Sequence, residues 1–142
     1  MQKVGSSAGS NLRQAPEPCA NLLAQVHARL GVLAILGNHD AGSDPHRITE
    51  FLQGKGITVL RNRSIPFEKD GHRLWLAGLD DVLEGQSDLE LTLRSIPKTE
   101  PVILLAHEPD CANAVSHYPV DFQLSGHSHV GQVRFPLIDA PH

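Results

Sequence analysis

The chain has 142 residues, of which 40% are apolar and 20% charged, and a formal net charge of −4. This length predicts one domain with a single core, and the composition is too apolar for a disordered chain. A net negative charge without a cluster of basic residues argues against general binding to nucleic acid or to anionic membranes.

Targeting signals are not evident in the sequence. The sequence contains no run of about 18 apolar residues, so no transmembrane helix is predicted. Residues 1–15 lack the apolar core of a signal peptide, so we expect a flexible lead-in before a domain over residues 16–142, and a cytoplasmic location. Cys19 and Cys111 lie outside any C-x-x-C unit, which favours free thiols over a disulfide or a metal site.

Apolar spacing predicts four helices. The first covers Pro16–Leu30 and ends at Gly31, because its apolar residues recur on one helical face. The second covers Pro45–Lys55 with Ile48, Phe51 and Leu52 inward. A capping-box pattern at Ser87-x-x-Glu90 opens the third, which runs to about Ile96, and a short fourth helix covers Pro109–His117.

Six apolar stretches alternate with these helices and are predicted strands. The first, VLAIL, is a continuous apolar run typical of a strand buried on both faces, and Lys69-Asp70-Gly71 is typical of a hairpin turn. This order predicts an α/β sheet with helices on its faces. The strands are Val32–Leu36, Ile57–Leu60, Ser64–Phe67, Arg73–Leu79, Val102–Ala106 and Asp121–Ser125.

Three of the predicted strands end in histidine-bearing loops. They are followed by Gly37-Asn38-His39-Asp40, by His107-Glu108-Pro109-Asp110 and by Gly126-His127-Ser128-His129. In open α/β sheets ligands bind at the carboxyl ends of strands, so these loops predict one shared cluster. Each loop alone could be a plain polar turn, whereas imidazole nitrogens with an amide oxygen together suit a borderline transition metal. The glycines before Asn38 and His127 are expected to let the chain turn sharply.

These motifs, in this order, resemble the later signature motifs of calcineurin-like metallophosphoesterases. The stretch Leu74–Asp81 (LWLAGLDD) and the HEPD loop further resemble a bacterial branch of phosphodiesterases related to YaeI and YkuE. The resemblance covers nearly all of the chain from Pro16 onward and implies a layered α/β sandwich. Some relatives in that branch hydrolyse the pyrophosphate of a nucleotide-linked lipid, which makes such a lipid one candidate substrate.

The resemblance also implies a site. Asn38, His107 and His127 would bind one metal ion, and His129 a second. His39 would stabilise the phosphoryl charge or protonate the leaving oxygen, so His39 and its neighbour Asp40 are the candidate catalytic residues. The metals would be Mn, Zn or Fe, which sites of this kind all accept, and would activate a hydroxide that attacks phosphorus.

The sequence departs from the family pattern in its front part. Family members begin with Asp-x-His and Gly-Asp-x-x-Asp motifs that supply further ligands and the carboxylate bridging both metals, and this sequence contains no Gly-Asp. We therefore expect the central portion of a longer domain. Asp80 and Asp81 are possible replacement carboxylates, although acids after a strand are more often solvated turn residues. The remaining histidines (His27, His46, His72, His117 and His142) are expected at the surface or its boundary.

Three functions remain open on this basis. The leading one is hydrolysis of a phosphodiester or pyrophosphate. The others are a catalytically impaired remnant that binds a protein partner, and a protein that binds one metal without phosphoryl chemistry. Because the absent strands would lie inside the family's sheet, Val32–Leu36 should have an open edge, and we expect a homo-oligomer, a symmetric dimer first of all.

Overall fold

The computed structural model describes residues 21–128. The predicted lead-in at residues 1–15 lies outside this part of the chain. Two sheets form: β1 pairs with β2 in parallel, and β3-β4-β5-β6 form a second sheet in that order. In the second sheet β3 and β4 are antiparallel, whereas β4, β5 and β6 are parallel. The strands are β1 (Val32–Ala34), β2 (Ile57–Val59), β3 (Arg63–Lys69), β4 (His72–Gly78), β5 (Val102–Leu105) and β6 (Phe122–Leu124).

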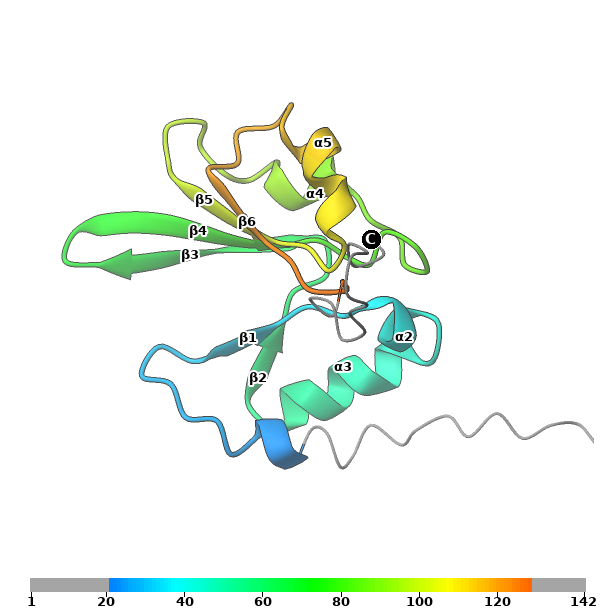
Figure 1. Cartoon of the computed structure of the whole chain (residues 1–142). Helices are drawn as coiled ribbons and strands as arrows, with labels where there is room; N and C mark the ends of the chain where they lie inside the picture. Colours follow the sequence, from blue (N-terminus) through cyan, green and yellow to red (C-terminus); the bar gives the residue numbers. More distant parts are fainter. Residues whose placement is uncertain (1–20, 129–142) are drawn as a thin grey trace, which may run out of the picture.

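Helices cover the outer side of each sheet. Figure 1 shows α3 against the two-stranded sheet, and α4 and α5 against the four-stranded sheet, so the layers run helix, sheet, sheet, helix. This confirms the predicted layered α/β fold. The helical elements are α2 (Asn38–Ala41), α3 (Pro45–Gly54), α4 (Leu89–Leu93), the 3-10 helix η1 (Pro109–Cys111) and α5 (Ala112–Val115).

Each sheet has its own apolar core on the helix side. Alternate residues of β5, Val102 and Leu104, point into the core under α4 and α5, with 2% and 0% of their surface exposed. Under α3, Leu52 packs with Leu36 and with β2, and Ile48 and Phe51 pack against this cluster from the side. The inward face predicted for the second helix is therefore confirmed.

The two sheets meet where β4 ends, at Gly78. A Cβ atom at Gly78 would lie 2.2 Å from Cβ of Leu60 and 3.0 Å from Cγ2 of Ile35. Leu60 follows β2 and Ile35 follows β1, so only a glycine lets the end of the four-stranded sheet approach the two-stranded one this closely. This contact holds the carboxyl ends of β1 and β4 beside each other.

The β3–β4 hairpin turns as predicted. Lys69 pairs with His72, which leaves a two-residue loop of Asp70 and Gly71. Their φ angles are 52° and 78°, the left-handed region that the favoured hairpin turns require.

Several predicted boundaries are wrong. Of the predicted helix Pro16–Leu30, the described part is helical only over residues 21–23. Leu22, Val26 and Leu30 are 68%, 53% and 65% exposed, so their apolar face has little to pack against, and a short helix without packing is marginal. The first strand is also shorter than predicted, and its three residues are only half-buried. Leu36, which was predicted to end this strand, lies beyond it and is fully buried.

The third and fourth helices begin and end differently from the prediction. Asp88, not Ser87, caps α4: its side chain accepts a hydrogen bond from the backbone N–H of Leu91 at 2.8 Å. The helix ends at Leu93, and Ile96 packs on the core from the following turn. The predicted helix over Pro109–His117 divides into η1 and α5.

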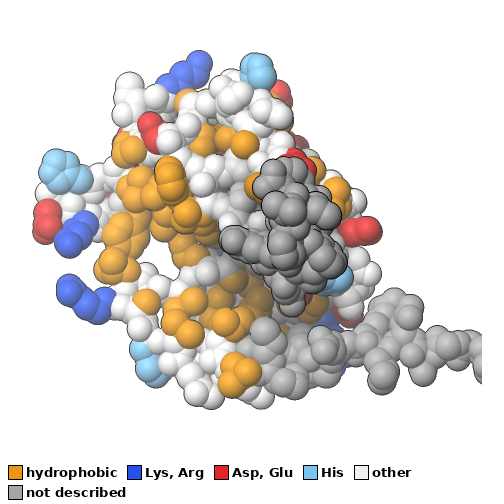
Figure 2. All heavy atoms as spheres, in the orientation of Figure 1, with side chains coloured by type: hydrophobic (Ala, Val, Ile, Leu, Met, Phe, Trp, Pro, Cys, Tyr) orange, Lys and Arg blue, Asp and Glu red, His pale blue; other side chains and the backbone are white. Residues whose placement is uncertain are grey.

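Hydrophobic side chains gather on both halves of the molecule in the view of Figure 2. Strand β6 leaves two large hydrophobic side chains exposed, Phe122 by 56% and Leu124 by 49%. Within residues 21–128 no helix is long and apolar enough to cross a membrane.

Candidate metal centre

The three histidine-bearing loops follow β1, β5 and β6 at the same end of the two sheets. Asn38 opens α2, four residues after Ala34, the last paired residue of β1. His107 follows β5 after Ala106, and His127 follows β6 after Ser125 and Gly126. The first sheet thus contributes the amide, and the second contributes both imidazoles.

The side chains of these three residues converge. Nε2 of His107 lies 3.2 Å from Oδ1 of Asn38, a spacing of a hydrogen bond and also of two neighbouring ligands on one ion. The rings of His107 and His127 meet edge to face, with 5.1 Å between their centroids. The predicted convergence of Asn38, His107 and His127 is therefore observed.

Backbone pairing explains why the two imidazoles are neighbours. The β5–β6 ladder continues past both strands, because Ala106 N–H donates to the carbonyl of Leu124 at 3.1 Å and Gly126 N–H donates to that of His107 at 3.0 Å. His127 itself has a φ of 61°, a left-handed conformation that non-glycine residues adopt uncommonly. The sharp turn thus falls on His127 and not on the preceding glycine.

Gly37 has a different role from the predicted sharp turn. Its φ of −104° and ψ of 177° are extended values open to any residue. However, a Cβ atom there would lie 2.7 Å from both Cε1 and Nε2 of His107. The glycine is required because the His107 ring packs directly on its backbone, next to Asn38.

The candidate catalytic residues belong to the single turn of α2. Asp40 accepts a hydrogen bond from Gly37 N–H at 3.1 Å and so closes the turn that presents Asn38. His39 is exposed between them. His129 lies outside the described residues, as does His142, whereas His27, His46, His72 and His117 are exposed as predicted.

Asp80 and Asp81 are not the solvated turn residues that we expected, because their exposed fractions are 4% and 1%. Arg61 donates to both oxygens of Asp80 at 3.1 and 2.8 Å. Burial alone would raise the pKa of Asp80, but the hydrogen bonds and charge of Arg61 outweigh it and leave this pKa lowered. Asp80 is thus a satisfied structural carboxylate and not a replacement ligand.

The side chain of Asp81 stabilises the loop after β4 through hydrogen bonds to its backbone. Its Oδ1 accepts from the backbone N–H groups of Leu83 and Glu84 at 3.0 and 2.7 Å. Burial would raise the pKa of Asp81, yet the side chain of Glu108 and these backbone donors lower it. Conversely, burial and the neighbouring Asp81 raise the pKa of Glu108.

Sequence reasoning missed Glu108 as a site residue. One nitrogen each of His107 and His127 and one oxygen of Glu108 lie within 4.8 Å of one another. No spacing signal in the sequence marked it, because its position depends on a contact with the loop after β4, where Val82 N–H donates to its carboxylate. Imidazole, amide and carboxylate donors in one cluster fit Mn, Zn or Fe.

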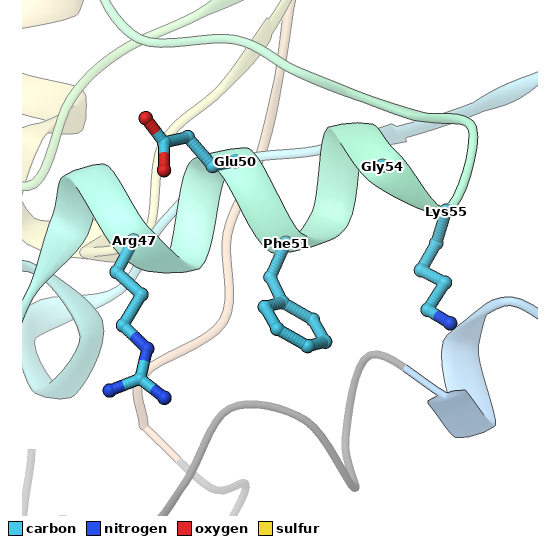
Figure 3. A pocket seen from close by; sticks show the side chains of 5 residues that line it. All are labelled: Arg47, Glu50, Phe51, Gly54 and Lys55. Atoms are coloured by element: carbon cyan, nitrogen blue, oxygen red, sulfur yellow. The ribbon is translucent and has the colours of Figure 1, made fainter.

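A pocket of about 290 Å³ lies elsewhere, along α3. Figure 3 shows Arg47, Phe51 and Lys55 pointing to one side of this helix and Glu50 to the other. None of its lining residues is a candidate ligand, so the pocket is separate from the metal centre.

Curated relatives of the chain carry names that refer to metallophosphoesterases or to a phosphodiesterase. The chain is 41% identical over 118 residues to the uncharacterized metallophosphoesterase YkuE of Bacillus subtilis, covering 82% of this chain and 41% of that protein. It is 36% identical over 114 residues to the phosphodiesterase YaeI of Escherichia coli, covering 76% of this chain and 40% of that protein. A transmembrane protein with metallophosphoesterase domain from Danio rerio is 38% identical over 142 aligned residues, covering 90% of this chain and 31% of that protein.

The chain therefore belongs to the metallophosphoesterases, as its motifs predicted. It spans about two fifths of the length of YkuE and YaeI. No profile of a protein family matches the chain. No solved structure matches it either.

Proposed function

We propose that the chain contributes to the metal-dependent hydrolysis of a phosphodiester or pyrophosphate bond. The observation that carries this proposal is the convergence of Asn38, His107 and His127 from three separate loops, with Asn38 and His107 3.2 Å apart. The similarity to YaeI, which is named a phosphodiesterase, supports the type of bond. A lipid linked to a nucleotide through a pyrophosphate is one substrate of this class.

Each residue then has a distinct role. Asn38, through its amide oxygen, and the imidazoles of His107 and His127 would hold one divalent ion, and His129 would contribute to a second. Bound metal lowers the pKa of a water molecule and offsets the charge of the phosphoryl oxygens. His39, exposed beside Asn38, would donate a proton to the leaving oxygen or stabilise the phosphoryl charge, while Asp40 fixes the turn that carries both.

The decisive experiment measures metal content and hydrolysis of bis-p-nitrophenyl phosphate with Mn²⁺ on the same preparations. His107→Ala should lose both bound metal and hydrolysis. His117→Ala is the matched control, because His117 is exposed and contacts the preceding helix α5, where its Nδ1 lies 3.0 Å from the Asn113 carbonyl. Wild-type chain that binds Mn²⁺ without hydrolysing the diester would instead support a metal-binding or protein-interaction remnant.

A further inference from the structure

Glu108 belongs to the same cluster as the candidate ligands. Its carboxylate and one nitrogen each of His107 and His127 lie within 4.8 Å of one another. An ion bonded at about 2.0–2.2 Å to each donor would hold them about 3–4 Å apart. The observed spacing therefore exceeds that of bound ligands by no more than about 1–2 Å.

The Glu108 carboxylate is buried but only partly satisfied. Its exposed fraction is 5%, and its Oε2 accepts one hydrogen bond, from Val82 N–H at 3.3 Å. Its Oε1 has no hydrogen-bond donor within the described part of the chain. A buried carboxylate oxygen without a donor costs free energy, and an ion beside this atom would satisfy it.

A second buried carboxylate, that of Asp81, lies beside Glu108. Asp81 is 1% exposed, and its Oδ2 likewise has no donor among the described residues. The side chains of the two acids interact directly. A divalent cation next to Glu108 would satisfy Oε1 and attract the carboxylate of Asp81 as well.

We propose that Glu108 is a further ligand of the ion held by Asn38, His107 and His127, with Asp81 as the residue that positions its carboxylate. This rests on the proposed function, since it concerns the same ion. It gives an otherwise neutral set of two imidazoles and an amide an anionic donor, which partly offsets the charge of the ion. Asp80, by contrast, is occupied by Arg61.

The test is the affinity of the full chain for Co²⁺, measured by calorimetry and by the absorption of bound Co²⁺, without any substrate. Glu108→Gln keeps the shape of the side chain and its acceptor for Val82 N–H. We expect at least about tenfold weaker binding and a changed Co²⁺ spectrum. Asp110→Asn is the matched control, because it removes the same charge from an exposed position two residues away and should bind as the wild type does.

A purely structural role for Glu108 gives a different result. If Glu108 only supports the loop, Glu108→Gln should lower the melting temperature of the metal-free chain. If Glu108 is a ligand, this temperature should stay equal or rise, because the amide of Gln still accepts a hydrogen bond from Val82 N–H. Wild-type affinity and spectrum in Glu108→Gln, or weaker binding together with a lower metal-free melting temperature, would overturn the proposal.

Two further results separate this proposal from the proposed function. Should Glu108→Gln fail to fold, Glu108→Asp retains the charge but shortens the side chain, and it should still weaken Co²⁺ binding; unchanged binding would overturn the ligand role. If the wild-type chain binds no Co²⁺, Mn²⁺ or Zn²⁺, this result would contradict both the ligand role of Glu108 and the proposed metal centre. Binding that depends on His107 but not on Glu108 would leave the proposed function intact.

Discussion

The two sides of the candidate centre are built in different ways. On the side of the four-stranded sheet, Asp80 and the two histidines are held in place: Arg61 holds Asp80, and the β5–β6 ladder holds His107 beside His127. On the side of the two-stranded sheet, one helical turn closed by Asp40 presents a half-buried Asn38 and an exposed His39. The rigid side is suited to hold an ion, and the accessible side is suited to meet a substrate.

The largest effect should come from breaking the accessible side. His39→Ala is expected to lower hydrolysis of bis-p-nitrophenyl phosphate by about 100-fold or more, as for a lost general acid, while bound metal stays unchanged. Turnover and metal content measured on one preparation check this. Loss of metal in His39→Ala would show that His39 is a ligand. It would contradict the assignment of metal binding to one side of the centre and substrate contact to the other.

A smaller effect should follow from forcing the two sides apart. Gly37→Ala would place a Cβ atom 2.7 Å from the His107 ring, which must then move away from Asn38. We expect metal affinity to fall by about tenfold or more. Gly54→Ala is the control, since nothing lies within 4 Å of a Cβ atom there and metal affinity should not change. Equal affinities of the two variants would show that the Asn38–His107 approach is not needed.

The rigid side can be broken at Asp80 without touching a candidate ligand. Asp80→Asn should lower the free energy of unfolding at pH 7 by about 1–3 kcal/mol, because Arg61 loses its charged partner. The pKa of Asp80 is lowered in the folded chain, so its contribution is present above the unfolded value of about 3.9 and is lost as the pH falls through the folded value. Urea unfolding at pH 7 and at pH 3 should therefore give a smaller difference between wild type and variant at the lower pH.

The edges of the two sheets give the last prediction. Among the described strands β1 pairs only with β2, and β6 exposes Phe122 and Leu124 beside its free edge. Open edges and exposed apolar side chains favour pairing with a second chain. We expect self-association, with a dimer as its first step, in light scattering at micromolar concentration. A folded monomer that shows no concentration dependence would contradict this.

Local sequence patterns predicted which helices, strands and turns form better than they predicted where each one begins and ends. The hairpin turn at Asp70 and Gly71 was predictable because two residues with positive φ have a clear sequence signature. The helix over Pro16–Leu30 was wrong in its described part because periodicity reports a potential apolar face and not whether anything packs on it.

The same limit applies to the site. The convergence of Asn38, His107 and His127 follows from three strands that end on the same side of the two sheets, and histidine-bearing loops after buried strands already indicated it. The burial of Asp81 and the position of Glu108 depend instead on contacts between the loops after β4 and β5. Such contacts join residues far apart in the chain, so no spacing rule could reveal them.

The division of ligands between the two sheets has a thermodynamic consequence. An ion bound by Asn38 from one sheet and by His107 from the other would act as a cross-link at the junction near Gly78. Binding that requires the folded arrangement adds to stability by mass action, about 2.7 kcal/mol at a free concentration 100 times the dissociation constant. The supply of metal in the cell would then set how much of this chain is folded, quite apart from how fast any substrate is turned over.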